Sequence, residues 1–492
     1  MSSCISSIFR NEVSLCATLL QFLFVLKFCD CLKPNFVFIL TDDQDNILGG
    51  MTPLAQSKHL IGDNGITFSN MFVTTPLCCP SRASILTGKY AHNHGVVNNS
   101  ISGNCNSYSW QASHEQKTFI TNLKKNGYAT FYAGKYLNQY GKSAAGGVHH
   151  VPPGWENWIG LVGNSCYYNY TLSVNGIPEK HGNDPQKDYL TDVIMEKAMR
   201  FLENQSETPF FMFLAPPAPH SPFTPSPKFK NAFRNFSAPR TPNFNFKAGK
   251  DKHWLLRQPP SPLPTDVIRD IDETFRNRWR TLLSVDEGVE NIFQVLKKKK
   301  MLRNTYVFLM SDNGFHLGQF SLPWDKRQPY EFDIRVPLLV RGPGIKPKTK
   351  VKESVLNIDI APTILALANL TSNENFDGKS LLPLLFGSDT SSRTEFIIEH
   401  QGESSSRPIP GCPQYQPQEV DTCEVDCICE DSRNNTYICL RELSVERNFV
   451  TCYFKDDENF VEAYNLTEDP YQMKNLYCSQ ENSPFFYPKL KN

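Results

Sequence analysis

The sequence lacks an excess of charge of either sign. Its 50 Lys and Arg residues are matched by 50 Asp and Glu residues over a length of 492. A balanced charge gives no electrostatic reason to bind nucleic acid or an anionic membrane surface, and we expect neither partner. The apolar fraction of 40% is ordinary for a globular protein, and the length allows more than one domain.

The sequence also lacks a long hydrophobic run after its N-terminus. The N-terminal run LCATLLQFLFVL, at residues 15–26, is shorter than the roughly 20 apolar residues that a transmembrane helix needs. Arg10 precedes this run, and small and polar residues follow it around residues 29–31. This order is typical of a secretory signal peptide, which we place at residues 1–31. A retained signal anchor is the alternative; otherwise we expect no membrane span.

Sequons and cysteines agree with the secretory route. Seven Asn-x-Ser/Thr sequons predict N-linked glycans at Asn98, Asn169, Asn204, Asn235, Asn369, Asn434 and Asn465. Of the 15 cysteines, seven crowd the C-terminal tail: Cys412, Cys423, Cys427, Cys429, Cys439, Cys452 and Cys478. In an oxidising compartment such a cluster predicts disulfides. A zinc site is the alternative, although the cluster contains no histidine.

The middle of the sequence has no internal repeat and alternates apolar runs with helical patterns. Near-continuous apolar runs predict strands that are buried on both faces of a sheet, at residues 35–41, 208–215, 304–311 and 335–342. The longest helical pattern begins near Thr265. Strands that alternate with helices predict an α/β domain with a largely parallel central sheet between helices.

Composition suggests where the chain divides. Residues 141–186, rich in Gly, Asn and Tyr, and residues 216–264, rich in Pro, predict long surface excursions. After about residue 385 the sequence changes to cysteines and shorter strand-like pieces. We therefore expect a main domain at residues 32–385 and a smaller, disulfide-rich C-terminal domain at residues 386–492.

Acidic side chains follow two of the predicted strands. Asp42 and Asp43 come at the end of the first strand, where open α/β sheets bind ligands, and Asp312 and Asn313 end the strand at residues 304–311. Adjacent carboxylates repel each other unless a cation or hydrogen-bond donors compensate. Oxygen ligands favour Ca²⁺ or Mg²⁺, so the pattern predicts a metal site if the strand ends converge. Capping of the next helix is the alternative for the first pair.

The stretch TTPLCCPSRASILTGKY, at residues 74–90, places Cys78 and Cys79 at the start of a predicted short helix. Pro80 suits the first turn of a helix. A helix N-terminus attracts anions, and Arg82 adds a planar cationic fork. A cysteine at this place would have a lowered pKa and could act as a nucleophile. A buried or disulfide-bonded Cys78 is the alternative.

Three further polar side chains lie shortly after a predicted strand or in a loop that leads into one: Lys135, His220 and Lys326. A single lysine of this kind is usually solvated. Two lysines, an arginine and a histidine around a bound cation would instead form a site for a small anion such as sulfate or phosphate.

These residues carry a resemblance to a known family. CCPSRASILTG resembles the sulfatase signature C-x-P-S-R, with Cys78 as the signature cysteine and Cys79 at the variable position. AGKYLNQYG, APHSP and SDNGFHLGQFSLP are similar to the glucosamine-6-sulfatases within that family. The resemblance covers nearly the whole chain, including residues 462–476. It implies the alkaline-phosphatase/sulfatase-like α/β fold.

The resemblance also implies roles for the site residues. Cys78 would be oxidised by the formylglycine-generating enzyme to Cα-formylglycine, whose hydrate is the nucleophile. Four residues would hold a Ca²⁺ that also contacts residue 78: Asp42, Asp43, Asp312 and Asn313. Arg82 would stabilise the formylglycine. The sulfate would be bound, and its leaving group assisted, by Lys135, His220 and Lys326.

The sequence departs from the arylsulfatase pattern at Leu137. Arylsulfatases usually have a histidine there, two residues after the lysine that matches Lys135, whereas glucosamine-6-sulfatases resemble this chain in having GKYLN. Asn138 and His94 are our candidates for the role of that histidine. His316, shortly after the predicted metal pair, would either touch substrate or pack.

The resemblance implies hydrolysis of the 6-O-sulfate ester of N-acetylglucosamine 6-sulfate units in heparan sulfate or keratan sulfate, in the lysosome. The alternative is a secreted heparan sulfate 6-O-endosulfatase, a class that carries a long basic domain which this charge-balanced sequence lacks. A catalytically silent glycan-binding protein is a third reading. A sulfated glycosaminoglycan is then the partner as substrate, and a homodimer is compatible with the resemblance.

Overall fold

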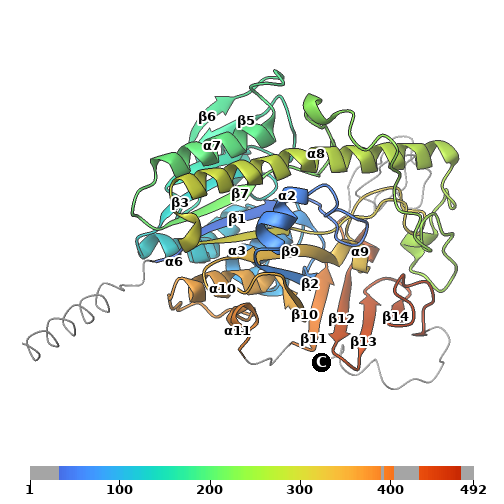
Figure 1. Ribbon diagram of the computed structural model, residues 1–492. Helices are drawn as coiled ribbons and strands as arrows, with labels where there is room; N and C mark the ends of the chain where they lie inside the picture. Colours follow the sequence, from blue (N-terminus) through green and yellow to red (C-terminus); the bar gives the residue numbers. More distant parts are fainter. Residues whose placement is uncertain (1–32, 389–392, 404–431, 478–492) are drawn as a thin grey trace, which may run out of the picture.

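A mixed sheet of ten strands forms the centre of the molecule, with the strand order β10-β2-β9-β8-β1-β7-β3-β4-β5-β6 (Figure 1). The computed structural model describes residues 33–388, 393–403 and 432–477. The strands of this sheet are β1 Asn35–Thr41, β2 Ile66–Phe72, β3 Ala129–Lys135, β4 Asn157–Leu161, β5 Thr171–Val174, β6 Ile177–Lys180, β7 Phe210–Ala215, β8 Thr305–Ser311, β9 Arg335–Arg341 and β10 Thr349–Leu356.

The four strands predicted from apolar runs are confirmed, and they lie side by side as β9-β8-β1-β7. Every residue of β1, β7 and β8 is buried, as expected of strands covered on both faces. Parallel pairing runs from β8 through β1, β7 and β3 to β4, and it also joins β10 to β2. The predicted α/β fold is therefore correct.

The sheet is less parallel than predicted, because β9 runs antiparallel between β2 and β8, and β5 and β6 add an antiparallel edge. Parallel neighbours need a crossover to the opposite edge of the sheet. The connection between β8 and β9, residues 312–334, contains no helix longer than the four-residue α9 (Glu331–Ile334), which leads directly into β9. β9 thus pairs with β8 without the helical crossover that usually joins parallel neighbours.

The surface excursion predicted at residues 141–186 is wrong in part, because this stretch contains β4, β5 and β6. β6 is mostly exposed, so its sequence carries no hydrophobic pattern that could have identified it. Residues 216–264 contain only two short 3₁₀ turns, Pro227–Phe229 and Trp254–Arg257, and no longer helix or named strand. The second prediction is thus correct.

Helices cover both faces of the large sheet (Figure 1). Side chains alternate along β1, so that Phe36 and Phe38 pack on one face while Val37 and Ile39 pack on the other. The Val37 face is covered by α7 (Leu190–Asn204) and by α8, Thr265–Lys298, which begins where the helical pattern predicted. The opposite face is covered by α3 (Cys78–Thr87), α6 (Phe119–Lys125) and α10 (Ile360–Leu367).

Shorter helices connect these elements: α2 Ala55–Ser57, α4 Ala91–His94, α5 Tyr108–Ser113 and α11 Leu382–Phe386. Among the described residues, no helix is both long and apolar enough to cross a bilayer. The signal peptide predicted at residues 1–31 lies outside the described residues, as do five of the seven tail cysteines.

A second sheet of four antiparallel strands lies beside the first, in the order β11-β12-β13-β14. Its strands are β11 Glu395–His400, β12 Tyr437–Leu443, β13 Asn448–Phe454 and β14 Val461–Asn465. Cys439 on β12 forms a disulfide with Cys452, its partner in register on β13, which confirms one bridge of the predicted disulfide-rich tail. The domain boundary predicted after residue 385 stays a prediction.

Candidate active site

The two acidic strand ends converge as predicted. β1 and β8 are parallel neighbours, paired in register up to the last residue of each, so the residues that follow them lie together. The backbone N–H of Asp43 donates to Oδ1 of Asp312 over 3.0 Å, and Nδ2 of Asn313 donates to Oδ1 of Asp43 over 2.8 Å. Asp42, Asp43, Asp312 and Asn313 are all buried.

Cys78 is the first residue of helix α3 and is fully buried beside these carboxylates. Its Sγ lies 3.8 Å from Oδ1 of Asp43. Ligand atoms of Asp42, Asp43, Cys78 and His220 all lie within 4.8 Å of one another. The strand ends and the start of α3 therefore form one site.

The expectation of a lowered pKa at Cys78 is wrong. Burial raises the pKa of its thiol to about 12, and the carboxylates of Asp43 and Asp42 act in the same direction, against the opposing charges of two lysines. A cysteine at a helix N-terminus has a lowered pKa when water or positive charge dominates its surroundings. Here burial dominates, so the unmodified side chain is a neutral thiol and a poor nucleophile.

Two lysines from distant parts of the chain point at the paired carboxylates. Lys135 is the last residue of β3, and its Nζ lies 2.9 Å from both carboxylate oxygens of Asp42. Nζ of Lys326 lies 2.7 Å from Oδ2 of Asp43. Burial alone would raise the pKa of both carboxyls, but the nearby basic side chains, these two lysines and His220 among them, together outweigh it. The pKa of Asp42 lies well below its usual range, and that of Asp43 is lowered to about 2.

Arg82 and His220 complete the predicted set. Nε of Arg82 donates to Oδ2 of Asp312 over 2.8 Å, and its Nη2 lies 3.4 Å from Oδ1 of Asp42. Nδ1 of His220 donates to the Ser221 carbonyl over 2.7 Å, which leaves Nε2, 3.7 Å from Oδ2 of Asp43, facing the site. Burial lowers the pKa of His220 to about 4 although the two carboxylates oppose this shift, so the ring is neutral above that pH.

The donor set fits a hard cation. Asp42, Asp43, Asp312 and Asn313 offer carboxylate and amide oxygens, which are the ligand atoms that hard cations prefer. Oδ1 of Asn313 is buried and has no hydrogen-bond partner among the described residues, which is costly for a polar atom unless a cation binds it. The Asp312 carboxylate is already engaged by Arg82 and by two backbone N–H groups. A buried metal site is therefore consistent with the structure.

His316, which the sequence left as either a substrate contact or a packing residue, is fully buried three residues after Asn313. Its Nδ1 lies 3.0 Å from Oδ2 of Asp333 on α9, and its backbone N–H donates to the Asp325 carbonyl. These contacts favour packing over substrate contact.

The two candidates for the missing histidine are placed differently. Nε2 of His94 lies 3.0 Å from Oγ of Ser84, and its Nδ1 accepts from the Val96 N–H over 3.1 Å, so both ring nitrogens are used away from the site. Asn138 is buried three residues after Lys135, and its Oδ1 has no hydrogen-bond partner among the described residues. The geometry favours Asn138.

His94 should make stability depend on pH. Burial lowers its pKa to about 3, whereas an unfolded histidine titrates near 6.5, so the unfolded chain binds more protons between these values. The contribution to stability is complete above about pH 6.5 and falls by roughly 1.4 kcal/mol per pH unit below it. Between about pH 7 and pH 5, urea unfolding of wild type should therefore lose about 2 kcal/mol more than that of His94→Asn. His92→Asn, which replaces an exposed histidine, is the control and should lose as much unfolding free energy as wild type. Equal losses of unfolding free energy in wild type and His94→Asn would contradict the role of His94.

Two site residues were missed by sequence reasoning. The hydroxyl of Ser165, which precedes β5, donates to Oδ2 of Asp42. The guanidinium of Arg278 on α8 donates to the backbone carbonyl of Asp43 over 2.6 Å. Nothing in the sequence singles out Ser165. Arg278 could have been recognised from the sequence, because it lies between Phe275 and Leu282 on the apolar face of α8. A charged side chain on a buried face needs a buried partner.

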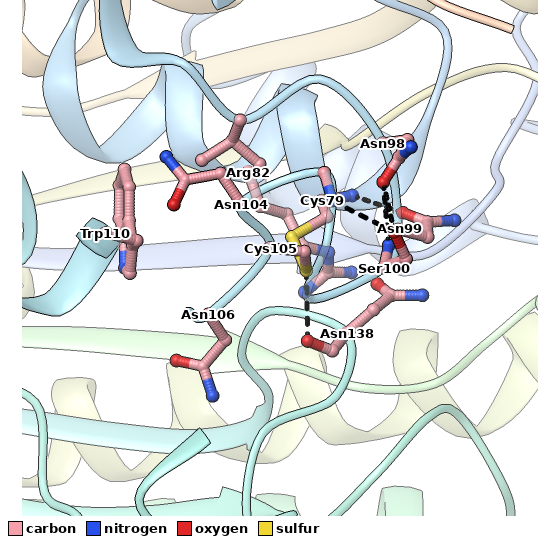
Figure 2. Close-up of a disulfide and its surroundings, with 12 residues drawn as sticks. Cys79, Arg82, Asn98, Asn99, Ser100, Asn104, Cys105, Asn106, Trp110 and Asn138 are labelled. Carbon is pink, nitrogen blue, oxygen red and sulfur yellow. Dashed lines mark hydrogen bonds between the residues drawn. A yellow bond between two sulfur atoms is a disulfide. The ribbon is translucent and has the colours of Figure 1, made fainter. Parts of the chain in front are cut away.

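The variable position of the signature has a structural role. Cys79 forms a disulfide with Cys105 (Figure 2). The neighbouring Cys78 has no disulfide partner, so the two adjacent cysteines differ in chemical state. The N–H of Cys79 donates to Oδ1 of Asn99 over 2.9 Å, and Sγ of Cys105 lies 3.0 Å from the carbonyl oxygen of Asn138 (Figure 2). The disulfide and Asn99 together fix the first turn of α3, whose N-cap residue supplies no side-chain cap.

Removing this disulfide should affect both stability and turnover. The variant Cys79→Ala/Cys105→Ala opens a loop with a sequence separation of 26, and about 3 kcal/mol of unfolding free energy should be lost. It should also lower kcat, because residue 78 loses its anchor. The matched variant Cys439→Ala/Cys452→Ala should lose stability while kcat is unchanged. Equal effects of the two variants on kcat would contradict the positioning role.

The seven predicted glycosylation sites are all accessible to some degree. Asn169, Asn204, Asn235 and Asn369 are exposed, and Asn98, Asn434 and Asn465 are partly exposed. None is buried, as glycan attachment requires. Their modification stays a prediction.

Comparison with known proteins shows what the chain is similar to. A model of the sulfatase family matches residues 34–370. The N-acetylglucosamine-6-sulfatase of Homo sapiens is 54% identical over 448 residues, which cover 90% of this chain and 81% of that protein. An extracellular sulfatase SULF-1 homolog of Drosophila melanogaster is 41% identical over 383 residues, which cover 75% of this chain and 33% of that protein.

The fold has solved counterparts. A protein in complex with its substrate D-glucosamine-2-N,6-O-disulfate aligns with a TM-score of 0.72 at 24% identity, covering 93% of this chain and 95% of that one. This likeness shows the fold. The family match spans more than half of the sequence and contains all the converging side chains described above, and the chain therefore belongs to the sulfatase family.

Proposed function

We propose that this sulfatase hydrolyses the 6-O-sulfate ester of N-acetylglucosamine 6-sulfate units in heparan sulfate or keratan sulfate. The observation that carries the proposal is the 54% identity over 90% of the chain with the human N-acetylglucosamine-6-sulfatase. The contacts among Cys78, the strand-end carboxylates and the two lysines support it, because a nucleophile derived from Cys78 would be buried beside side chains of both charges.

The charges of the site suit a sulfate ester. A sulfate monoester is anionic and repels nucleophiles, so fixed positive charges must screen it before attack at sulfur. Lys135 and Lys326 reach the site from β3 and from the loop before β9, and Arg82 adds a rigid fork. We assign sulfate binding to the two lysines and to His220. The neutral His220 ring can hold or pass a proton at Nε2, which faces the site.

The proposed reaction also needs a modified residue and a metal ion. Cα-formylglycine, made from Cys78 by the formylglycine-generating enzyme, would supply a hydrated aldehyde whose first hydroxyl attacks sulfur and whose second allows sulfate to leave. Ca²⁺ would supply positive charge to the sulfate oxygens and the nucleophile. We assign its binding to the oxygen-rich set of Asp42, Asp43, Asp312 and Asn313 together with residue 78. The orphan Oδ1 of Asn313 supports this assignment.

Two alternatives are separable. An extracellular heparan sulfate 6-O-endosulfatase is less favoured, because the Drosophila extracellular sulfatase is 41% identical and only 33% of it is covered. A lysosomal location accompanies the first function and a secreted one the second. In either case the substrate is a sulfated glycosaminoglycan, and a homodimer is compatible with both.

The test is an assay of the purified, secreted protein on oligosaccharides of defined sulfation. One substrate carries N-acetylglucosamine 6-sulfate at its non-reducing end, and a matched substrate carries it only internally. We expect sulfate release from the terminal unit. Release only from the internal unit would favour the endosulfatase, and release from neither would contradict the proposal.

A further inference from the structure

The backbone of Asp43 adopts a left-handed conformation, with φ at 66°. A non-glycine residue rarely does so, and such a conformation persists where its surroundings fix it. In an extended chain, adjacent side chains point to opposite sides. Asp42 and Asp43 are adjacent, yet carboxylate oxygens of both lie within 4.8 Å of each other. The left-handed turn is what brings both carboxylates to one site.

Hydrogen bonds hold every polar group of Asp43. Its N–H donates to Asp312, and its carboxylate accepts from Asn313 and Lys326. Its backbone carbonyl accepts from Nη2 of Arg278 over 2.6 Å. The first three partners belong to the predicted site, whereas the last comes from helix α8.

Arg278 contacts several parts of the site with one buried side chain. Its Nη2 also lies 3.2 Å from Oδ1 of Asp45, and its Nη1 donates over 3.4 Å to the carbonyl of Pro219, the residue before His220. Its guanidinium carbon lies 3.9 Å from the centre of the Phe315 ring, two residues after Asn313. Only a planar fork can reach all of these groups, so lysine cannot replace it.

A purely structural ion pair between Arg278 and Asp45 would be the simpler reading. Against it, the shortest contact of Arg278 is with the carbonyl of Asp43 and not with the carboxylate of Asp45. Arg280, two residues further along α8, is an arginine with a structural role only and serves for comparison. It is also buried, but it contacts the Ala232 carbonyl and the half-exposed Glu273, away from the site.

We infer that Arg278 is a positioning residue, which holds Asp43 in its left-handed conformation and so keeps the Asp42 and Asp43 carboxylates directed at one cation. This inference rests on the cation site of the proposed function. Loss of the guanidinium frees the Asp43 carbonyl, and the carboxylate then spends less time in the place where it binds the cation. The effect should therefore be seen in cation affinity before substrate is added.

The experiment compares Arg278→Met and Arg278→Lys with the matched control Arg280→Met. Ca²⁺ half-saturation is measured on chelator-treated protein from the Ca²⁺-dependent shift in thermal unfolding, and kcat and KM are measured at saturating Ca²⁺. The formylglycine content of each preparation is determined by mass spectrometry. Arg278→Met should raise the Ca²⁺ half-saturation roughly 10- to 100-fold, and saturating Ca²⁺ should recover most of the lost kcat with KM little changed.

The control and the lysine variant keep the inference falsifiable. Arg280→Met should lower the unfolding temperature while Ca²⁺ half-saturation stays at the wild-type value. Arg278→Lys keeps the positive charge opposite Asp45, and it should also show a raised Ca²⁺ half-saturation. If Arg278→Met does not fold, this lysine variant tests the positioning role of Arg278. Unchanged half-saturation in the Arg278 variants, or an equal change in Arg280→Met, would overturn the inference.

Failure of the proposed function gives a different pattern. A wild-type protein that is inactive on N-acetylglucosamine 6-sulfate but hydrolyses an aryl sulfate with Ca²⁺ dependence would overturn the substrate alone, and the same variants would still decide the role of Arg278. A wild-type protein with no cation dependence would overturn both the cation site and the positioning role.

Discussion

Replacing Cys78 with alanine is expected to lower kcat by at least about 10⁴-fold, the scale seen when a nucleophile is removed from a catalytic site. Cys78 is fully buried at the first position of α3, where alanine fits without adding volume. The fold should therefore survive. Cys78→Ser should lose as much activity, because a serine hydroxyl cannot form an aldehyde hydrate.

The chain offers a matched control for this loss. Cys166 is the other described cysteine without a disulfide, and it is only partly buried and outside the group of candidate ligands. Cys166→Ala should keep wild-type kcat. Activity in Cys78→Ala equal to that in Cys166→Ala would contradict a nucleophile at position 78.

Replacing Asp43 with asparagine is expected to lower kcat/KM by at least about 10²-fold and to raise the Ca²⁺ concentration needed for activity. The change preserves shape, and asparagine tolerates the left-handed backbone of this position. It removes one negative charge from the cation site and, with it, the nearer of the two carboxylates that pair with buried Lys326, which leaves only Asp325 at 3.8 Å. Both effects weaken the site, and neither depends on which glycan is bound.

A buried carboxylate elsewhere separates this effect from simple destabilisation. Asp286 on α8 accepts from the backbone N–H groups of Gln56 and Ser57 and takes no part in the site. Asp286→Asn should reduce stability while the Ca²⁺ requirement stays unchanged. A wild-type Ca²⁺ requirement in Asp43→Asn would contradict the assignment of Asp43 as a ligand.

Sequence reasoning found the parts of the site that leave a local signal. Asp42 and Asp43 are adjacent carboxylates at the end of an apolar run, and Asp312 and Asn313 are a carboxylate and an amide at the end of another. Because both runs become neighbouring parallel strands, their ends had to meet. Cys78 was found from the signature around it, and its neighbourhood follows from where α3 begins.

What sequence reasoning missed depends on contacts between distant segments. The pKa of Cys78 was predicted with the wrong sign because the helix N-terminus is local, whereas the burial that dominates comes from the whole site. The partner of Cys79 lies in a loop that follows α4, and nothing in spacing identifies Cys105. β6 is an exposed edge strand without a hydrophobic pattern, and the apolar run of β9 does not show which direction the strand takes in the sheet.

The most direct test of the account is mass spectrometry of the peptide at residues 74–90, taken from active protein secreted by cells. The account predicts that residue 78 has lost its sulfur and carries an aldehyde, while Cys79 remains a cysteine that is linked to Cys105 before reduction. An unmodified Cys78 in a preparation that releases sulfate from N-acetylglucosamine 6-sulfate would contradict a formylglycine nucleophile at position 78.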